Sequence, residues 1–143
     1  MLFRSTYRVK PYEGIVSLLT ELKMRGMKLG VLSNKPDRQA VHVVSEIFGE
    51  DLFDIVWGQK EGVPRKPDPS ALLLMAGDLG ADPSEIIYIG DSEVDIRTGQ
   101  AAGVKTVLVS WGFRQPEDLR KAGAERIVDS TQEIFEITKE QEE

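Results

Sequence analysis

The sequence predicts an α/β domain built around a mostly parallel sheet. Segments with helical periodicity alternate with short apolar segments along nearly the whole chain, and short connections join them. Strands that alternate with helices pair in parallel, because each intervening helix makes a right-handed crossover. The length of 143 residues suits one compact domain, and no internal repeat or low-complexity tract divides it.

The first half of the chain contains two predicted helices and two predicted strands. Residues 12–25 form a helix that Gly26 ends, with one apolar face made of Ile15, Leu18, Leu19 and Leu22. Residues 28–33 are almost continuously apolar, as a strand buried on both faces requires. Asp37 is expected to cap the next helix, whose core face holds Val41, Val44, Ile47 and Phe48. Residues 54–58 form a brief second strand.

The second half repeats the alternation after a loop rich in Gly and Pro. Ser70 is expected to cap a helix through Leu79, and residues 86–89 form a buried strand that leads into another helix. That helix runs to Ala102, where Gly103 ends it. The remaining expected elements are a strand at 106–109, a helix at 116–122, a strand at 126–128 and a helix at 131–139.

The composition excludes several classes of function. A net charge of −6 and a pI near 4.9 disfavour binding to nucleic acid or to an anionic membrane surface. No apolar run approaches the roughly 20 residues that cross a bilayer. Because the chain has no cysteine and His42 is its one histidine, it cannot form a thiol nucleophile, a histidine-rich zinc site or a Ser-His-Asp triad. The polar start of the chain and the lack of cysteine favour a cytoplasmic location.

Polar side chains gather where the predicted strands end. Ser33 and Asn34 follow the first strand, Lys66 lies in the next long loop, and Asp91 and Asp95 follow the strand at 86–89. Ligands of parallel α/β sheets bind beyond the carboxyl ends of the strands. Oxygen ligands suit Mg²⁺, and a hydroxyl, an ammonium and backbone N–H groups suit phosphate. This set of residues therefore predicts a site for phosphate and Mg²⁺.

The order of these motifs resembles that of the haloacid dehalogenase superfamily. Ser33, Lys66 and Gly90-Asp91-x-x-x-Asp95 are similar to its second, third and fourth motifs. Lys66-Pro67-Asp68-Pro69 and residues 90–96 are similar to the form found in phosphoglycolate phosphatases, as are 101–104, 109–113, 122–124 and 127–130. The resemblance covers nearly everything from Tyr7 to Phe135. It implies a three-layer, Rossmann-like core.

The resemblance also implies an activity, Mg²⁺-dependent hydrolysis of a small phosphorylated metabolite through a phospho-aspartate. It assigns Ser33, Asn34 and Lys66 to phosphate binding and Asp91 to the metal. Ser33, Lys66 and Asp95 would be the catalytic residues of this chain, with Asp95 supporting Asp91 directly or through Lys66.

The chain departs from this pattern at its start. The family's first motif, Asp-x-Asp-x-Thr, which supplies the nucleophile, is absent, and so is the cap that selects the substrate. Residues 1–9 resemble the end of that cap, 10–138 the core, and 139–143 an acidic tail. Without the central nucleophile strand, two strand edges lack partners, a state that folded proteins avoid. The predicted strands at 28–33 and 86–89 could pair with each other, or a second copy of the chain could fill the gap between them. The third alternative, which we expect, is that a missing N-terminal segment fills this gap.

Two alternatives compete with an enzyme. The chain could bind phosphate and Mg²⁺ without turnover, or it could be a receiver-like signalling domain, although receivers carry paired acids after their first strand. Each site residue also has an ordinary structural interpretation. Ser33 and Asp91 could cap helices, Lys66 could be a solvated surface charge, and Asp95 could favour a helix dipole.

Overall fold

The computed structural model describes residues 14–112 and 114–142, and it confirms the predicted alternation of helices and strands. The predicted end of the cap at 1–9 and the last residue of the predicted acidic tail, 143, lie outside the described residues. The elements are α1 (Ile15–Met24), β1 (Gly30–Pro36), α2 (Asp37–Phe48), β2 (Ile55–Gln59), α3 (Ser70–Asp78), the 3₁₀ turn η1 (Pro83–Glu85), β3 (Ile87–Gly90), α4 (Glu93–Ala102), β4 (Lys105–Val109), α5 (Pro116–Lys121), β5 (Ile127–Val128) and α6 (Thr131–Glu142).

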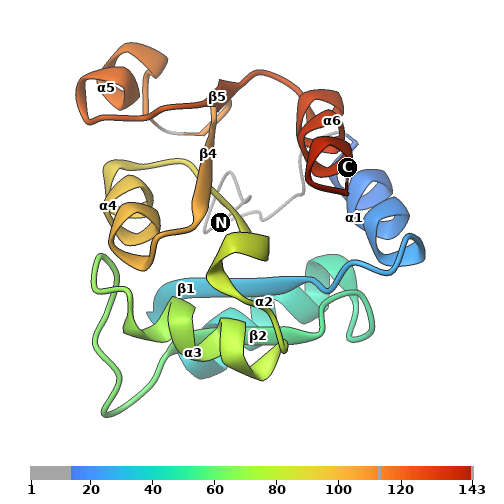
Figure 1. Ribbon diagram of the computed structural model, residues 1–143. Helices are drawn as coiled ribbons and strands as arrows, with labels where there is room; N and C mark the ends of the chain where they lie inside the picture. The colour runs from blue at the N-terminus through green and yellow to red at the C-terminus, as the bar shows by residue number, and fades with distance from the viewer. Residues whose placement is uncertain (1–13, 113, 143) are drawn as a thin grey trace.

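The strands form two separate parallel sheets. β1 pairs with β2, and β4 lies between β3 and β5 (Figure 1). Within the described residues, β1 and β3 do not pair with each other. The expected parallel arrangement is confirmed, and the inner edges of the two sheets have not closed on one another.

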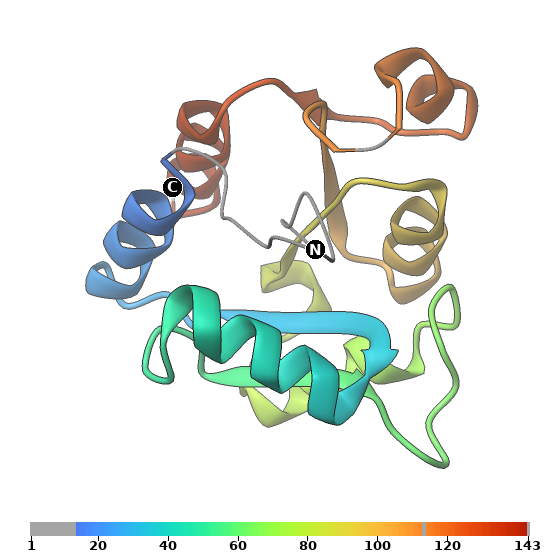
Figure 2. The same cartoon turned by 180° about the vertical axis from the view of Figure 1, so that it is seen from behind.

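Helices cover both faces of the strands, which confirms the three-layer architecture. α2 and α3 lie on opposite faces of the β1–β2 sheet, as the two views in Figures 1 and 2 show. α1 and α6 lie side by side and pack on the same face of the second sheet, whereas α4 packs on the other face. The carboxyl ends of the strands are thus left open for a site.

Among the described residues, side chains rather than backbone hydrogen bonds hold the two sheets together. One cluster joins Leu29, next to β1, to Val107 and Val109 of β4, beneath α1 and α6. A second cluster joins Leu32 of β1 to Tyr88 of β3 beneath α3. Burial of apolar side chains is worth roughly 1.5–3 kcal/mol each, so these two clusters couple the sheets strongly.

Several local predictions were wrong in detail. Asp37 is the first helical residue of α2, not its cap, and its carboxylate accepts a hydrogen bond from Gly58 N at 2.9 Å. Ser70 likewise begins α3, where its N–H donates to Asp68 Oδ1. On α2 the buried face contains Ala40 and Val44, whereas Val41 is 43% exposed. The prediction is therefore wrong at Val41, whose place on the buried face Ala40 takes, whereas Val44 is buried as predicted and Ile47 and Phe48 are half-buried.

In the part of the chain that the structure describes, no helix is long and apolar enough to cross a membrane.

Candidate active site

The predicted site residues lie where β1 and β3 end. Asn34 lies near the carboxyl end of β1, and its side chain holds the loop that carries Lys66. Its Nδ2 donates to Lys66 O at 3.2 Å and its Oδ1 accepts from Lys66 N at 3.1 Å. These two hydrogen bonds bring Lys66 back to the sheet from a loop 32 residues further along the chain. Asn34 therefore positions Lys66, and its side-chain amide is engaged in doing so.

The Lys66 ammonium is buried at the centre of the site. Its Nζ donates to Asp95 Oδ1 at 3.0 Å, to Tyr88 Oη at 3.1 Å and to Leu32 O at 3.3 Å. The side chains of Lys66 and Asp95 are 8% and 4% exposed, so this is an ion pair shielded from water. The solvated surface charge considered above is wrong for Lys66. A buried ammonium needs all three of its donors satisfied, and here they are.

Asp95 accepts four hydrogen bonds. Besides Lys66, Tyr88 Oη donates to its Oδ1 at 2.8 Å, while Asp91 N and Ser92 Oγ donate to its Oδ2 at 3.0 and 3.2 Å. Gly90 is needed for this approach, because a Cβ there would collide with the Asp95 side chain. This explains the spacing Gly90-Asp91-x-x-x-Asp95: the first turn of α4 folds the second carboxylate back under the end of β3.

The electrostatics separate the two aspartates. Burial alone would raise the pKa of Asp95, but the charge and hydrogen bond of Lys66, with the hydroxyl of Tyr88, hold it well below its usual range. Burial raises the pKa of Asp91, and the neighbouring Asp95 carboxylate adds to this, while Lys66 and Arg114 oppose it. The surroundings of Asp95 therefore favour its charged form, whereas the charged form of Asp91 would be favoured by a cation beside it.

The surroundings of Asp91 are compatible with its predicted role as a Mg²⁺ ligand. No hydrogen bond within residues 14–112 and 114–142 occupies its carboxylate, and the backbone of Gly112 lies close enough that a Cβ there would touch Asp91 Oδ2 at 2.9 Å. The described residues contain no group of three or more His, Cys, Asp or Glu side chains suited to a metal. Mg²⁺ often uses only one or two carboxylates and keeps its waters, so a single free carboxylate is compatible with it.

Ser33 lies beside this network and is 2% exposed. Its Oγ accepts a hydrogen bond from Lys35 N at 3.0 Å, which leaves the hydroxyl hydrogen available as a donor. Ser33, Asn34 and Lys66 line one small cavity of about 70 Å³, together with Trp57 and Arg65. The structure thus brings together all five predicted residues. Ser33, Asn34 and Lys66 line the small cavity, and hydrogen bonds link Lys66 to Asp95 and Asp95 to the backbone of Asp91.

Sequence reasoning missed three contributors to the site. Tyr88 was assigned only to a buried strand, yet its hydroxyl joins Lys66 to Asp95. Ser92 supports Asp95, and Arg114 pairs with Glu93 at 3.0 Å and faces the charge of Asp91. A tyrosine inside an otherwise aliphatic strand, seven residues before an acid, was the available signal for the first.

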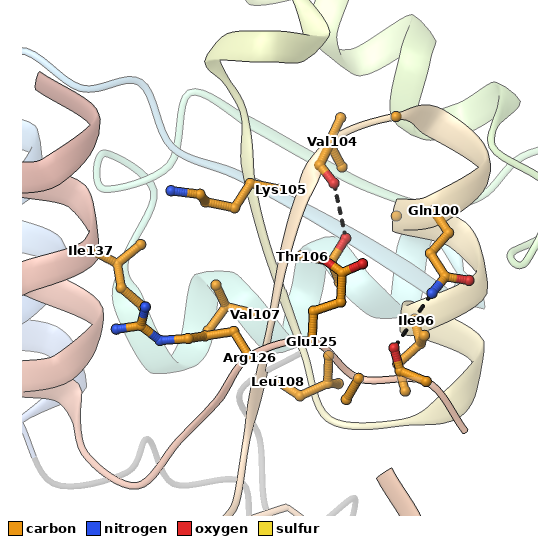
Figure 3. Close-up of a pocket in the computed structure, with 14 residues that line it drawn as sticks. Ile96, Gln100, Val104, Lys105, Thr106, Val107, Leu108, Glu125, Arg126 and Ile137 are labelled. Atoms are coloured by element: carbon orange, nitrogen blue, oxygen red, sulfur yellow. Dashed lines mark hydrogen bonds between the residues drawn. The ribbon is translucent and has the colours of Figure 1, made fainter. Parts of the chain in front are cut away.

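A separate cavity of about 460 Å³ lies away from these residues, between α4, β4 and the segment that leads into β5 (Figure 3). Its hydrogen bonds run from Thr106 Oγ1 to Val104 O and from Gln100 Nε2 to Gly123 O. Lys105, at the amino end of β4, is among the residues that line it, and none of the predicted site residues are. Ligands of such sheets bind at the other end.

Comparison with known proteins agrees with this geometry. Residues 3–109 match the family described as haloacid dehalogenase-like hydrolase. The chain belongs to this family. The N-acetylmuramic acid 6-phosphate phosphatase of Pseudomonas aeruginosa is 36% identical over 129 residues, which make up 90% of this chain and 57% of that protein. The phosphoglycolate phosphatase of Rhodospirillum rubrum is 34% identical over 119 residues, 82% of this chain and 48% of that protein.

Solved structures of this haloacid dehalogenase family share the fold. A candidate phosphoglycolate phosphatase from Lactobacillus delbrueckii subsp. bulgaricus superposes with a TM-score of 0.88 and 37% identity, over 92% of this chain and 54% of the other. CbbY from Rhodobacter sphaeroides, solved in complex with phosphate, superposes with a TM-score of 0.76 and 25% identity, over 89% and 57%. The chain therefore spans about half the length of the relatives it matches.

Proposed function

We propose that this chain contributes the Lys66–Asp95–Asp91 part of the active site of a Mg²⁺-dependent phosphatase of small phosphomonoesters. One observation carries the proposal: a buried Lys66–Asp95 pair lies beside Asp91, whose pKa is raised and whose carboxylate is free of hydrogen bonds from the described residues. A phosphoryl group adds further negative charge there, so a cation at Asp91 would stabilise both groups.

The residues divide the work. Ser33 Oγ–H would donate to a phosphoryl oxygen, and Lys66, held by Asp95 and Tyr88, would present its positive charge to the phosphate and nucleophile. Asp91 would hold Mg²⁺, which offsets charge on the phosphoryl oxygens when bound. Asn34 would act by fixing the Lys66 loop. The phosphatases named among the relatives support a phosphorylated metabolite, such as phosphoglycolate or a sugar phosphate, as the substrate.

The nucleophile would come from outside the described residues. Asp37, Asp54 and Asp68 each accept a hydrogen bond from a nearby backbone N–H, so their carboxylates serve local structure. A segment that precedes the core, or a second copy of the chain, would therefore have to complete the site.

A second function is favoured by that same observation: binding of phosphate and Mg²⁺ without turnover. Among the described residues, Asp91 has the one free carboxylate near Lys66, and the proposal assigns it to the metal. The chain alone would then lack a nucleophile and would bind phosphate and Mg²⁺ without hydrolysing a substrate.

One assay separates the two functions. Purified chain is incubated with Mg²⁺ and either p-nitrophenyl phosphate or phosphoglycolate, and Mg²⁺ binding is measured in parallel by calorimetry. Asp91→Asn is the test variant, and Asp78→Asn, on the exposed side of α3, is the matched control. Turnover lost only in Asp91→Asn supports the phosphatase. Mg²⁺ binding lost only in Asp91→Asn, without turnover in any variant, supports the binding function. If Asp91→Asn changes neither, both are wrong.

A further inference from the structure

The cavity at the amino end of β4 has the size of a small-molecule site. Its volume of about 460 Å³ lies within the usual range of about 300–1,000 Å³ for ligand pockets, whereas the cavity beside Ser33 and Lys66 holds about 70 Å³. The buried side chains that line it are apolar. Its exposed lining includes three charged side chains, Lys105, Glu125 and Arg126.

The cavity lies where one edge of β4 has no partner. β5 is two residues long and pairs with Leu108 and Val109. The N–H groups of Leu108 and Ser110 donate to carbonyls of the β5 segment, so both residues turn their backbone groups toward that edge. Because these groups alternate in direction along a strand, Thr106 presents its N–H and C=O at the same edge. Within the described residues, no strand pairs with Thr106 there.

The α6 face of this edge is cationic. Val107 and Ile137 of α6 belong to one apolar cluster, and Lys105, two residues before Val107, has the same orientation along the strand. Ile127 packs on the opposite face, so Arg126 beside it turns toward α6. Figure 3 shows both cationic side chains extending toward Ile137. Neither side chain forms an ion pair with any residue that the structure describes.

The α4 face of the same edge carries the opposite charge. Leu108 belongs to the apolar cluster of Ile96 on α4, and Thr106, two residues before Leu108, has the same orientation. Figure 3 shows the Glu125 side chain running toward Thr106. The Glu125 carboxylate is likewise without an ion pair among residues 14–112 and 114–142. The cavity therefore passes from an anionic side to a cationic side, with the backbone groups of Thr106 between them.

We infer that this cavity binds a zwitterionic dipeptide with apolar side chains, laid across the edge of β4. Its ammonium would meet Glu125, and its carboxylate would meet Lys105 and Arg126. Its one amide offers a donor and an acceptor, which are the two groups that complement the N–H and C=O of Thr106. Its side chains would cover the apolar lining on both faces.

Other small ligands match only part of this arrangement. A free amino acid carries both charges on one carbon and has no amide for Thr106. A phosphate or a fatty acid would leave Glu125 without a partner and close to a second anion. In an extended dipeptide, the ammonium and the carboxylate lie roughly 5–7 Å apart with the amide between them. Substrates of parallel sheets bind at the other end of the strands, so this is a second site and does not rest on the proposed function.

The test varies the ligand against the unchanged full chain. Leu-Leu is titrated and followed by the amide shifts in NMR spectra, beside N-acetyl-Leu-Leu without the ammonium, Leu-Leu-amide without the carboxylate, and free leucine without the amide. We expect 1:1 binding of Leu-Leu with a Kd of about 1 mM or tighter, which is ordinary for a ligand of this size. Each of the other three should bind at least about threefold more weakly, because each lacks one of the three polar contacts.

Matched variants assign each end of the ligand. Glu125→Gln should weaken the binding of Leu-Leu about two- to fivefold and leave that of N-acetyl-Leu-Leu unchanged, because the acetyl group has already removed the ammonium. Arg126→Gln should weaken Leu-Leu by a similar factor and leave Leu-Leu-amide unchanged. Glu117→Gln removes the same charge as the first variant from an exposed position on α5 outside the cavity, and it should change neither ligand.

The same spectra locate the ligand. The amides of Thr106, Glu125 and Arg126 should shift on binding, while those of Ser33 and Lys66 should not. Equal affinity for all four ligands would overturn the inference, as would shifts centred on Ser33 and Lys66. So would a Glu117→Gln variant that weakens binding as much as Glu125→Gln does, or no binding at ~10 mM Leu-Leu by a chain that circular dichroism shows to be folded.

Discussion

At the scale of single residues, the site depends on one buried ammonium. Lys66 reaches three acceptors, and removing its charge leaves Asp95 as an isolated carboxylate that is 4% exposed. The hydrogen bonds from Asp91 N, Ser92 and Tyr88 remain, but none brings a positive charge. Breaking a buried pair by removing one partner is far more costly than removing both.

This asymmetry predicts the behaviour of Lys66→Met. We expect it to lower the free energy of unfolding by ~3–5 kcal/mol in urea titrations, because the Asp95 charge loses its counterion. The double variant Lys66→Met/Asp95→Asn should recover much of that loss. Lys105→Met, at an exposed position, is the control and should stay within ~0.5 kcal/mol of the parent. A single variant as stable as the parent would show that the pair is not buried in solution.

The raised pKa of Asp91 predicts a dependence of stability on pH. Because the folded state holds the proton more tightly than the unfolded state, the contribution of Asp91 is full below its unfolded pKa, near 3.8, and is lost as pH rises through the folded value. In buffer with EDTA, Asp91→Asn should therefore raise Tm by ~1–3 °C at pH 8 and by less at pH 4. Scanning fluorimetry of the parent, Asp91→Asn and Asp78→Asn measures this. A gain that is larger at pH 4 than at pH 8 would contradict the sign.

At this scale, sequence reasoning identified residues that the structure brings together where chemistry and position coincided, and their roles stay predictions. Ser33, Lys66, Asp91 and Asp95 stood out because polar residues follow apolar runs at strand ends. Tyr88 did not, because a hydrophobic pattern counts tyrosine as a strand residue and is blind to where its hydroxyl points. Asn34 was expected to bind phosphate, and only three-dimensional structure could show that its amide is engaged by the Lys66 backbone.

At the scale of elements, α4 lies unusually close to β4. A Cβ at Gly99 would collide with Thr106 Oγ1 and would approach Thr106 Cβ at 2.9 Å. Gly99 is therefore a contact position, although glycine in the interior of a helix normally weakens it. Gly77 in α3 is a natural comparison, because nothing lies within 4 Å of a Cβ built there.

The pair predicts opposite signs for the same substitution. Gly99→Ala should destabilise the protein by ~1–3 kcal/mol through overpacking, whereas Gly77→Ala should stabilise it by up to ~1 kcal/mol through helix propensity. Urea unfolding of both variants measures this, and Thr106→Ala in the Gly99→Ala background should restore part of the loss. If Gly99→Ala is stabilising, α4 does not pack on β4 as described.

The boundaries of elements show the limits of pattern reading. Asp37 and Ser70 are good capping residues, so each was predicted to precede its helix, yet each is the first residue within it. Asp37 is held by Gly58 N and Ser70 by Asp68, tertiary and loop contacts that a local capping rule does not contain. On the buried face of α2, Val41 was predicted where Ala40 lies, because the pattern favoured the larger apolar side chain.

At the scale of the whole molecule, the two sheets share no backbone pairing within the described residues, yet two apolar clusters span both. The sequence led us to expect unpaired edges from the absence of one motif. It could not show whether those edges would close, because closure depends on whether the helices above and below allow it. Leu29 and Leu32 pack against partners from both sheets, which keeps the sheets in place while an apolar groove of about 470 Å³ remains between β1 and β3.

This arrangement predicts one cooperative unfolding transition rather than two. Trp57 lies in β2 and Trp111 follows β4, so Trp111→Phe leaves a reporter on the first sheet and Trp57→Phe leaves one on the second. For each single-tryptophan variant, the urea midpoint from fluorescence is compared with the midpoint from circular dichroism. We expect the two midpoints to agree in both variants, because unfolding of either sheet would expose apolar clusters that both sheets share. Leu32→Ala serves as the perturbation: it removes a side chain from the cluster that joins β1 to β3 and should move both fluorescence transitions down together, by ~2–5 kcal/mol. Two separated transitions, or a shift confined to Trp57, would mean that the sheets fold as independent units and that the groove between them is not a fixed feature of the molecule.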